Sequence, residues 1–442
     1  MNQDLQEQGV IASGKVKSAH RFPTHVLASG FHSLKVRNFR LFIFGQIVSL
    51  TGTWMETTAT AWLVLTITNS PLALGLVTTL QFLPVMLLSL YGGVLADKLP
   101  KRRTLITTQT LLLIQAGIFA TLVGTGSIQL WHLYVLAVTQ GLIIAIDTPV
   151  RQAFVSEMVG RDELVNAVSL NSMTFNSARI IGPAIAGIVI AKLGIAPALY
   201  FNTASYVAVI IALYLMREKD LFKVAKKPQG SAWKNVKEGL AYTWHTPQIL
   251  VIMIVVGAIG TFGYNFTVLL PLISDFVLHI DAAGFGLLSS FFGLGSLIAA
   301  ISTAYIKAPN LRRIFVASAI FSVLLGLTAL SHIFAVTAVI MAFIGVAGIT
   351  FSISANSMLQ LNTPDELRGR VMSLNVLLVM GSTPIGAFLI GLMSDHLGVP
   401  AAIITCASLC LIGVGIAAAY WRHHIHAAVE MLPQATVAAH MP

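Results

Sequence analysis

The sequence predicts an all-α integral membrane protein with twelve transmembrane helices in two pseudo-symmetric bundles of six. Three observations support this prediction: an apolar composition, a regular series of long apolar runs, and an internal duplication. Of the 442 residues, 56% are hydrophobic and 10% are charged, and the mean hydropathy is +0.82. This composition excludes an ordinary water-soluble globular domain, because such domains carry far more charge.

Apolar runs of about 20 residues, long enough to cross a bilayer as helices, recur along the chain. The first bundle, 41–216, holds runs at 41–67, 72–96, 104–124, 129–150, 166–192 and 197–216. The second bundle, 249–421, holds runs at 249–274, 283–306, 312–331, 334–360, 372–394 and 399–421. Three segments remain outside the bundles: an N-terminal tail, a basic linker and a C-terminal tail, at 1–40, 217–248 and 422–442.

The distribution of Lys and Arg predicts the orientation of the helices. Of the 27 Lys and Arg residues, only Lys192, at the end of the fifth run, falls on the predicted outer side, and only Arg179 lies deep inside a span. All the others lie in the tails, the linker and the remaining turns, which are therefore expected to be cytoplasmic. We expect a multi-pass protein of the bacterial inner membrane with both termini in the cytoplasm. The net charge of +10 reflects this topology, so no nucleic-acid partner is expected.

The two halves of the chain resemble each other. "RDELVNAVSLNSM" from Arg161 is similar to "PDELRGRVMSLNVL" from Pro364, and the match continues without a gap from Ile181 and Ile385. Earlier in each half, "SPLALGLV" matches "DAAGFGLL". Two duplicated halves of six spans favour a carrier, in which substrate binds near mid-membrane between halves that rock around it.

The predicted loop between the second and third spans, "GGVLADKLPKRR", combines a glycine, an acid and basic residues at fixed spacing. It fits the pattern G-x-x-x-D-[RK]-x-G-[RK]-[RK] except at Pro100, and so resembles the signature loop of the major facilitator superfamily. The resemblance implies a gating element that latches the two halves in one conformation. Its members here are Gly93, Asp97, Lys98, Lys101 and Arg102. The alternative is an ordinary basic cytoplasmic turn.

The fifth span contains "SARIIGPAIAG", in which Gly182, Pro183 and Gly187 resemble the Gly-Pro motif of antiporters and exporters in that superfamily. Alanine stands at two positions where glycine is usual, and Gly and Pro also serve as kinks and packing points in any membrane helix. Phrases such as "NFRLFIFGQIVSLTGTWM" are similar to the bacterial exporter branch that contains the enterobactin exporter and macrolide-efflux proteins. This resemblance implies export of small amphipathic molecules.

Two charged residues, Glu56 and Arg179, lie deep inside predicted spans, where an ionisable side chain is costly and usually functional. Each lies about 22 to 25 Å along its helix from the cytoplasmic side, and each shares a helix face with small and polar residues. We hypothesise that the two face or pair with each other beside a central cavity, with Glu56 exchanging a proton under the control of Arg179. The alternative is a fixed structural ion pair.

Other polar residues within the spans are candidates for the gate or the cavity. Asp147 and Arg151 are spaced to pair along one helix and, through the family resemblance, to join Asp97 in the latch; a solvated helix end is the alternative. Four amides are candidates for lining the substrate cavity or for helix packing: Gln140, Asn176, Asn265 and Asn375.

The sequence lacks the motifs that are typical of several kinds of enzyme and of ATP binding. There is no HExxH, no GxSxG and no phosphate-binding G-x-x-x-x-G-K-[ST], so we expect no enzyme, no metal, no cofactor and no direct use of ATP. The predicted function is secondary active transport: proton-coupled export of small amphipathic molecules of the drug or siderophore type by alternating access. A lipid or lysophospholipid flippase of the same fold is the alternative. Expected partners are the substrate, protons and membrane lipid, and we expect a monomer.

Overall fold

The computed structural model describes residues 32–160, 162–222, 232–304 and 309–438, and every long element within these ranges is a helix. Within helices, only the backbone is described for 89–97, 232–236, 304 and 425–438. Gly93 and Asp97 of the predicted gating loop fall in the first of these stretches, so their contacts lie outside the described residues.

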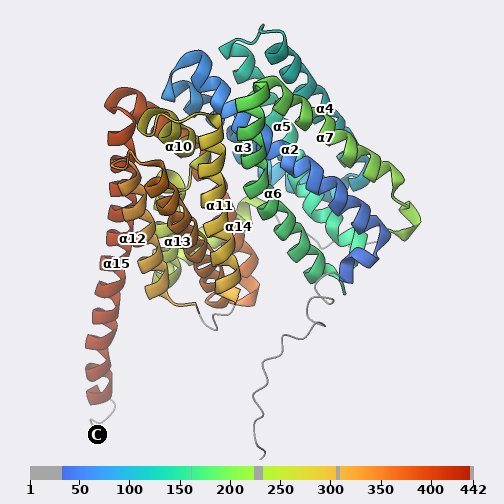
Figure 1. Ribbon diagram of the computed structural model, residues 1–442. Helices are drawn as coiled ribbons and strands as arrows, with labels where there is room; N and C mark the ends of the chain where they lie inside the picture. Colours follow the sequence, from blue (N-terminus) through green and yellow to red (C-terminus); the bar gives the residue numbers. More distant parts are fainter. Residues whose placement is uncertain (1–31, 161, 223–231, 305–308, 439–442) are drawn as a thin grey trace, which may run out of the picture.

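Six long helices form the N-terminal half, drawn from blue to green in Figure 1: α2 (Arg37–Thr68), α3 (Pro71–Lys98), α4 (Lys101–Gly124), α5 (Leu130–Val159), α6 (Leu164–Leu193) and α7 (Ile195–Leu215). Helix α2 packs against α6 and α7, α3 packs against α5, and α4 packs against α7 and α5. This arrangement places the small and polar face of α2 inside the bundle.

The C-terminal half, drawn from yellow to red beside the first, follows the short helix α8 (Ala232–His245). Helix α11 packs against α13, while α12 packs against α13 and α15. Its elements are α9 (Pro247–Ala258), η3 (Ile259–Gly263), α10 (Phe266–Leu272), η4 (Ile273–Val277), α11 (Ala282–Ala304), α12 (Leu311–Thr328), α13 (Phe334–Leu361), α14 (Asp365–Leu397) and α15 (Val399–Ala438).

The predicted architecture is confirmed. With Pro247–Val277 counted as one span, eleven helices in the described ranges are long and apolar enough to cross a membrane. Helix α2 is the twelfth member of the two bundles. Its 32 residues extend over about 48 Å, enough to cross a bilayer, but Glu56 and the accompanying Gly, Ser and Thr residues lower its hydropathy.

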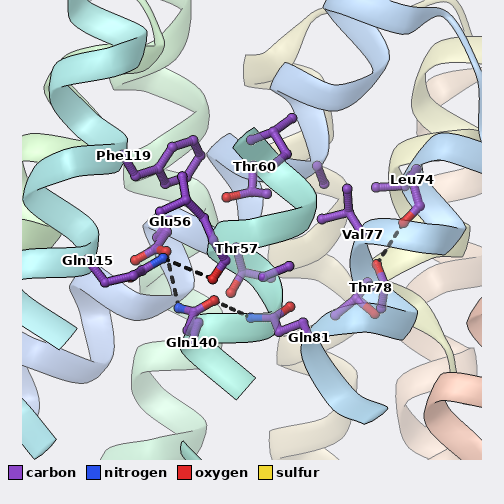
Figure 2. A pocket seen from close by; sticks show the side chains of 15 residues that line it. Glu56, Thr57, Thr60, Leu74, Val77, Thr78, Gln81, Gln115, Phe119 and Gln140 are labelled. Carbon is purple, nitrogen blue, oxygen red and sulfur yellow. Dashed lines mark hydrogen bonds between the residues drawn. The ribbon is translucent and has the colours of Figure 1, made fainter. Parts of the chain in front are cut away.

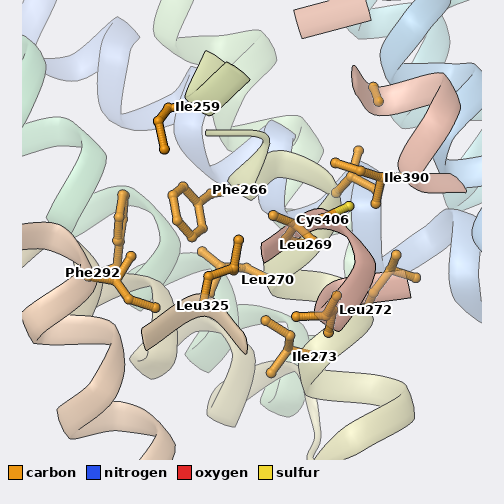
Figure 3. Packing of buried hydrophobic residues seen from close by; sticks show 14 of the residues in the cluster. Ile259, Phe266, Leu269, Leu270, Leu272, Ile273, Phe292, Leu325, Ile390 and Cys406 are labelled. Carbon is orange, nitrogen blue, oxygen red and sulfur yellow. The ribbon is translucent and has the colours of Figure 1, made fainter. Parts of the chain in front are cut away.

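The seventh predicted span, 249–274, is not one continuous helix. It widens into a π-helical turn at η3, and Tyr264 and Asn265 separate η3 from α10. The Asn265 Nδ2 atom donates hydrogen bonds to the carbonyl oxygens of Gly260 (3.1 Å) and Thr261 (2.8 Å), which satisfies backbone groups freed at the break. The side chains of Phe266 and Leu269 on α10 are buried in a cluster with hydrophobic residues of other helices, including Phe292 and Leu325 (Figure 3).

The last helix also differs from the sequence prediction. The twelfth span was predicted to end at residue 421, with a tail from 422, whereas α15 continues to Ala438. The residues from Ala427 to Leu432 are mostly good helix formers, and the helix range extends past Pro433, a residue that usually ends or kinks a helix.

Candidate functional site

Glu56 on α2 is a buried carboxyl group held by amide side chains. It is 4% exposed, and its Oε1 accepts a hydrogen bond from Gln140 Nε2 (3.1 Å). Asn202 on α7 donates to its Oε2. Gln140 Oε1 in turn accepts from Gln81 Nε2 (2.7 Å), so a chain of amides leads from α3 through α5 to the carboxyl group (Figure 2). Among the described residues no cationic side chain forms an ion pair with Glu56.

Glycines explain why these amides can reach Glu56. A Cβ built on Gly52 would lie 2.6 Å from Ser205 Oγ and 2.8 Å from Asn202 Oδ1, so α2 and α7 approach closely beside the carboxyl group. A Cβ on Gly141 would lie 2.3 Å from the carbonyl oxygen of Gln81, so α5 and α3 are equally close. Gln81 and Asn202 were not among the site residues predicted from the sequence. Both are polar residues inside predicted spans, the signal that identified Gln140.

Arg179 occupies a different cavity, between the two halves. This cavity has a volume of about 210 Å³ and shares Thr57, Ala61 and Thr267 with the small cavity at Glu56. Its aromatic lining comes from both halves: Trp54, Phe82, Tyr264, Phe266, Phe285 and Phe292. The guanidinium carbon of Arg179 lies 5.7 Å from the centroid of the Phe292 ring, and its side chain interacts with Tyr264.

The hypothesis that Glu56 and Arg179 pair is therefore wrong for this structure. Equal depth along two helices does not fix the direction in which each side chain points. Glu56 points into the N-terminal bundle, where Gln140 and Asn202 donate to it. Arg179 points toward the C-terminal half and contacts Phe292.

The other predicted cavity residues have three different environments. Asn375 lines a cavity within the C-terminal half, where its Nδ2 lies 3.4 Å from Asn356 Oδ1. Asn176 donates to the carbonyl oxygen of Ser172 on its own helix (2.8 Å). Asn265, 1% exposed, satisfies the helix break described above. Of the predicted amides, Gln140 is thus the one in contact with Glu56.

The basic residues of the predicted gating loop bind within the N-terminal half. Lys101 Nζ lies 2.6 Å from Glu157 Oε1, at the end of α5. Arg102 donates from Nε to the carbonyl oxygen of Leu213 (2.8 Å) and from Nη1 to Glu218 Oε1 (2.5 Å). Lys98 is exposed. The described members of the loop therefore join the ends of α4, α5 and α7 and do not connect the two halves in this conformation.

Asp147 and Arg151 form a buried polar cluster near the same end of the bundle. Asp147 Oδ1 accepts from Thr108 Oγ1 (2.6 Å) and Gln109 Nε2 (2.8 Å), and its Oδ2 accepts from Arg151 Nε (2.9 Å). Arg151 Nη1 also donates to Gln46 Oε1 (2.5 Å). The cluster joins α2, α4 and α5, and contact with Asp97 lies outside the described residues.

We expect Asp147→Ala to lower the free energy of unfolding by about 3 kcal/mol, because it leaves the partly buried Arg151 charge without its buried carboxylate partner. Thermal unfolding of the purified protein in detergent measures this change. Asp365→Ala is the matched control, since its ion pair with Arg368 is largely exposed and such pairs contribute little. Equal midpoint temperatures for the two variants would contradict this role.

Two seams hold the halves together at the end of the molecule where α2 ends and α3 begins. In the first seam α3 packs against α14. A Cβ on Gly75 would lie 2.6 Å from the carbonyl oxygen of Ala387, and Thr79 Oγ1 donates to the carbonyl oxygen of Pro384 (3.0 Å).

In the second seam α6 packs against α11. A Cβ on Gly286 would lie 2.4 Å from the carbonyl oxygen of Pro183, and one on Gly187 would lie 2.6 Å from that of Ala282. Ser290 Oγ donates to the carbonyl oxygen of Ile180 (3.1 Å). Pro183 and Gly187 of the predicted antiporter-like motif thus lie at the contact between halves.

The two seams are equivalent by the internal duplication. Gly75 and Gly286 occupy the same position in the matching segments, as do Thr79 and Ser290. Gly182, in contrast, faces the other side of α6, where its Cβ position lies 2.5 Å from Trp54 Cβ.

The fold and the site together define a multi-pass membrane protein of the transporter type, with a cavity between two duplicated halves. The family model described as "Transmembrane secretion effector" matches residues 28–440, and the chain belongs to this family of the major facilitator type. The superfamily resemblance read from the sequence is therefore confirmed.

Relatives of this chain are bacterial transporters. The chain is 27% identical to the Staphyloferrin A transporter of Staphylococcus aureus, over 81% of its own length and 90% of the relative's. It is 25% identical to the multidrug efflux pump Tap of Mycolicibacterium fortuitum (86% and 94%) and 24% identical to the enterobactin exporter EntS of Shigella boydii (80% and 84%).

Solved structures support the fold. The nucleoside transporter NupG is similar with a TM-score of 0.70 at 11% identity, covering 87% of this chain and 99% of that one. A bacterial homologue of ferroportin in an inward-facing state is similar with a TM-score of 0.64 at 16% identity, covering 87% and 98%. At these identities the likeness concerns the fold alone.

Proposed function

We propose that this protein exports small amphipathic molecules across the bacterial inner membrane in exchange for protons. The observation that carries the proposal is the buried Glu56 carboxyl group, which has no cationic partner among the described residues and adjoins the cavity between the halves. The multidrug efflux and enterobactin export functions named for two relatives support outward transport.

The surroundings of Glu56 suit a group that gains and loses one proton per cycle. Burial favours the neutral acid, because the charged form has lost its hydration. The amide donors of Gln140 and Asn202 favour the carboxylate. These effects oppose each other, so a change in hydration or in the bound substrate can shift the balance between the two forms.

The seams support alternating access. They close the space between α3 and α14 and between α6 and α11 toward one end, which we assign to the outer side of the membrane. The basic linker and the Lys101 and Arg102 contacts lie toward the other end, which we assign to the cytoplasm. In this assignment the structure represents an inward-facing state, and opening the two seams would expose the cavity to the outside.

Transport into everted membrane vesicles tests this function. A panel of dyes, macrolides and catecholate siderophores is supplied on the cytoplasmic face, with the lumen either acidic or at equal pH. We expect at least one member to accumulate when the lumen is acidic, since protons then flow outward in exchange. Accumulation that is independent of the gradient, or movement of lipid alone, would refute proton-coupled export and favour the flippase alternative.

A further inference from the structure

We propose that Arg179 is the anion-binding residue of the cavity between the halves, and that the transported molecule carries an oxyanion on a flat apolar body. The proposal rests on the transport function proposed above, and it specifies the charge of the substrate. An aromatic carboxylate or phenolate has this chemistry. A cationic amphipath would be disfavoured.

Arg179 has no acidic partner among the described residues. None of the ion pairs among the described residues involves Arg179, and its buried Nε has no hydrogen-bond acceptor within the protein. A guanidinium carries donors on all of its nitrogens and cannot lose its charge. A buried donor without an acceptor is costly, and an oxyanion from the substrate would supply an acceptor for Nε.

The charge in the cavity is positive. None of the described residues that line this cavity is Asp or Glu, so Arg179 is the charge that a bound molecule meets there. Glu56 belongs to the adjoining cavity, and its two oxygens already accept from Gln140 and Asn202. A cationic substrate would therefore be repelled by Arg179 and would find no carboxylate in contact.

The walls of the cavity are rich in aromatic side chains. Trp54 and Phe285 line the cavity from opposite halves, and Tyr264, Phe266 and Phe292 form a connected aromatic cluster beside Arg179. Arg179 lies over the face of Phe292, which orients the planar guanidinium. Aromatic walls bind flat apolar bodies, and a planar guanidinium binds a planar carboxylate through two parallel hydrogen bonds.

Binding of a matched pair of fluorescent probes tests the proposal: a coumarin carboxylate and its neutral carboxamide. The full-length protein is purified in detergent, and quenching of tryptophan fluorescence reports binding. We expect the wild type to bind the carboxylate at least about tenfold more tightly than the carboxamide, the usual effect of one charge-assisted pair. Arg179→Gln removes this preference and leaves carboxamide binding within about twofold, because the aromatic walls remain.

Two further variants keep the result interpretable. Arg179→Lys retains the charge but loses the planar fork, so we expect an intermediate preference for the carboxylate. Arg103→Gln removes an exposed charge on α4 and should bind both probes like the wild type. Equal binding of the two probes by the wild type, or equal loss of both in Arg179→Gln, would overturn the assignment of Arg179 as the anion site.

Vesicle transport of the same probes separates this inference from the proposed function. If the wild type transports both probes equally in response to an acidic lumen, proton-coupled export stands and the anion assignment fails. If it binds the carboxylate through Arg179 but moves neither probe under any gradient, the anion assignment stands and the proposed export fails.

Discussion

Glu56→Gln is expected to abolish export driven by a pH gradient, reducing it to the level of vesicles without the protein. The glutamine side chain has nearly the same size as glutamate, so it fits between Gln140 and Asn202. It cannot take up or release a proton in the physiological range. Exchange of labelled for unlabelled substrate at equal pH should continue, because that exchange needs no net proton movement.

The control for this variant is Glu366→Gln, which removes an exposed carboxyl group in the first turn of α14. It should transport like the wild type under both conditions. Gradient-driven export by Glu56→Gln at the wild-type rate would show that Glu56 is a structural residue and would remove the basis for the proton site. Loss of both gradient-driven export and equal-pH exchange would instead indicate a folding or binding defect.

Gly286→Ala is expected to open the outer end of the cavity. The added Cβ would lie 2.4 Å from the carbonyl oxygen of Pro183, so α11 and α6 must move apart. Overpacking of this kind costs about 1 to 3 kcal/mol, which shifts the equilibrium away from the closed seam by about fivefold or more. A cysteine introduced at Thr58, which lines the central cavity, should therefore react faster with a membrane-impermeant maleimide in intact cells.

The native cysteines Cys406 and Cys410 are buried, so they give a low background in this measurement. Gly75→Ala in the equivalent seam should have the same effect, because its Cβ would lie 2.6 Å from the carbonyl oxygen of Ala387. Gly415→Ala is the matched control, since nothing lies within 4 Å of its Cβ position. Identical labelling rates in the Gly286 and Gly415 variants would show that the seam is not a gate.

The fold was largely predictable from the sequence because hydrophobic length and duplication are properties of the chain itself. The twelve helices and their division into two halves followed from the apolar runs and the repeated segments. The break at Tyr264 and Asn265 did not, because its apolar neighbours are compatible with a continuous helix. The capping of Gly260 and Thr261 by Asn265 depends on the folded geometry.

The site was predictable only in part: Glu56, Gln140 and Arg179 were expected, whereas Gln81 and Asn202 were not, and the expected pairing was wrong. Burial of a carboxylate in an apolar run pointed to Glu56 and to a polar surrounding, and the structure places Gln140 beside it. Depth along a helix was estimated from residue counts, whereas the direction of each side chain depends on how the helices rotate against their neighbours. That rotation assigns Glu56 to the interior of one bundle and Arg179 to the space between the two.

The contacts that form the two seams could not be predicted from the sequence. The duplication aligned Gly75 with Gly286, but sequence similarity between halves does not reveal which helices of opposite halves meet. The structure shows both glycines in contact with helices of the other half, each accompanied by a hydroxyl donor one turn further along, Thr79 or Ser290. The similarity of the two aligned segments thus has a structural explanation, because each forms one of the two equivalent seams that close the cavity.

Proton movement driven by substrate is a direct test of proton-coupled export through Glu56. Proteoliposomes containing the purified protein and a trapped pH-sensitive dye receive a gradient of a transported panel compound with no initial pH difference. We expect substrate flow to generate an opposite proton flow, which is absent with Glu56→Gln and persists with Glu366→Gln. Substrate flow through the wild type without any change in lumenal pH would contradict proton-coupled export.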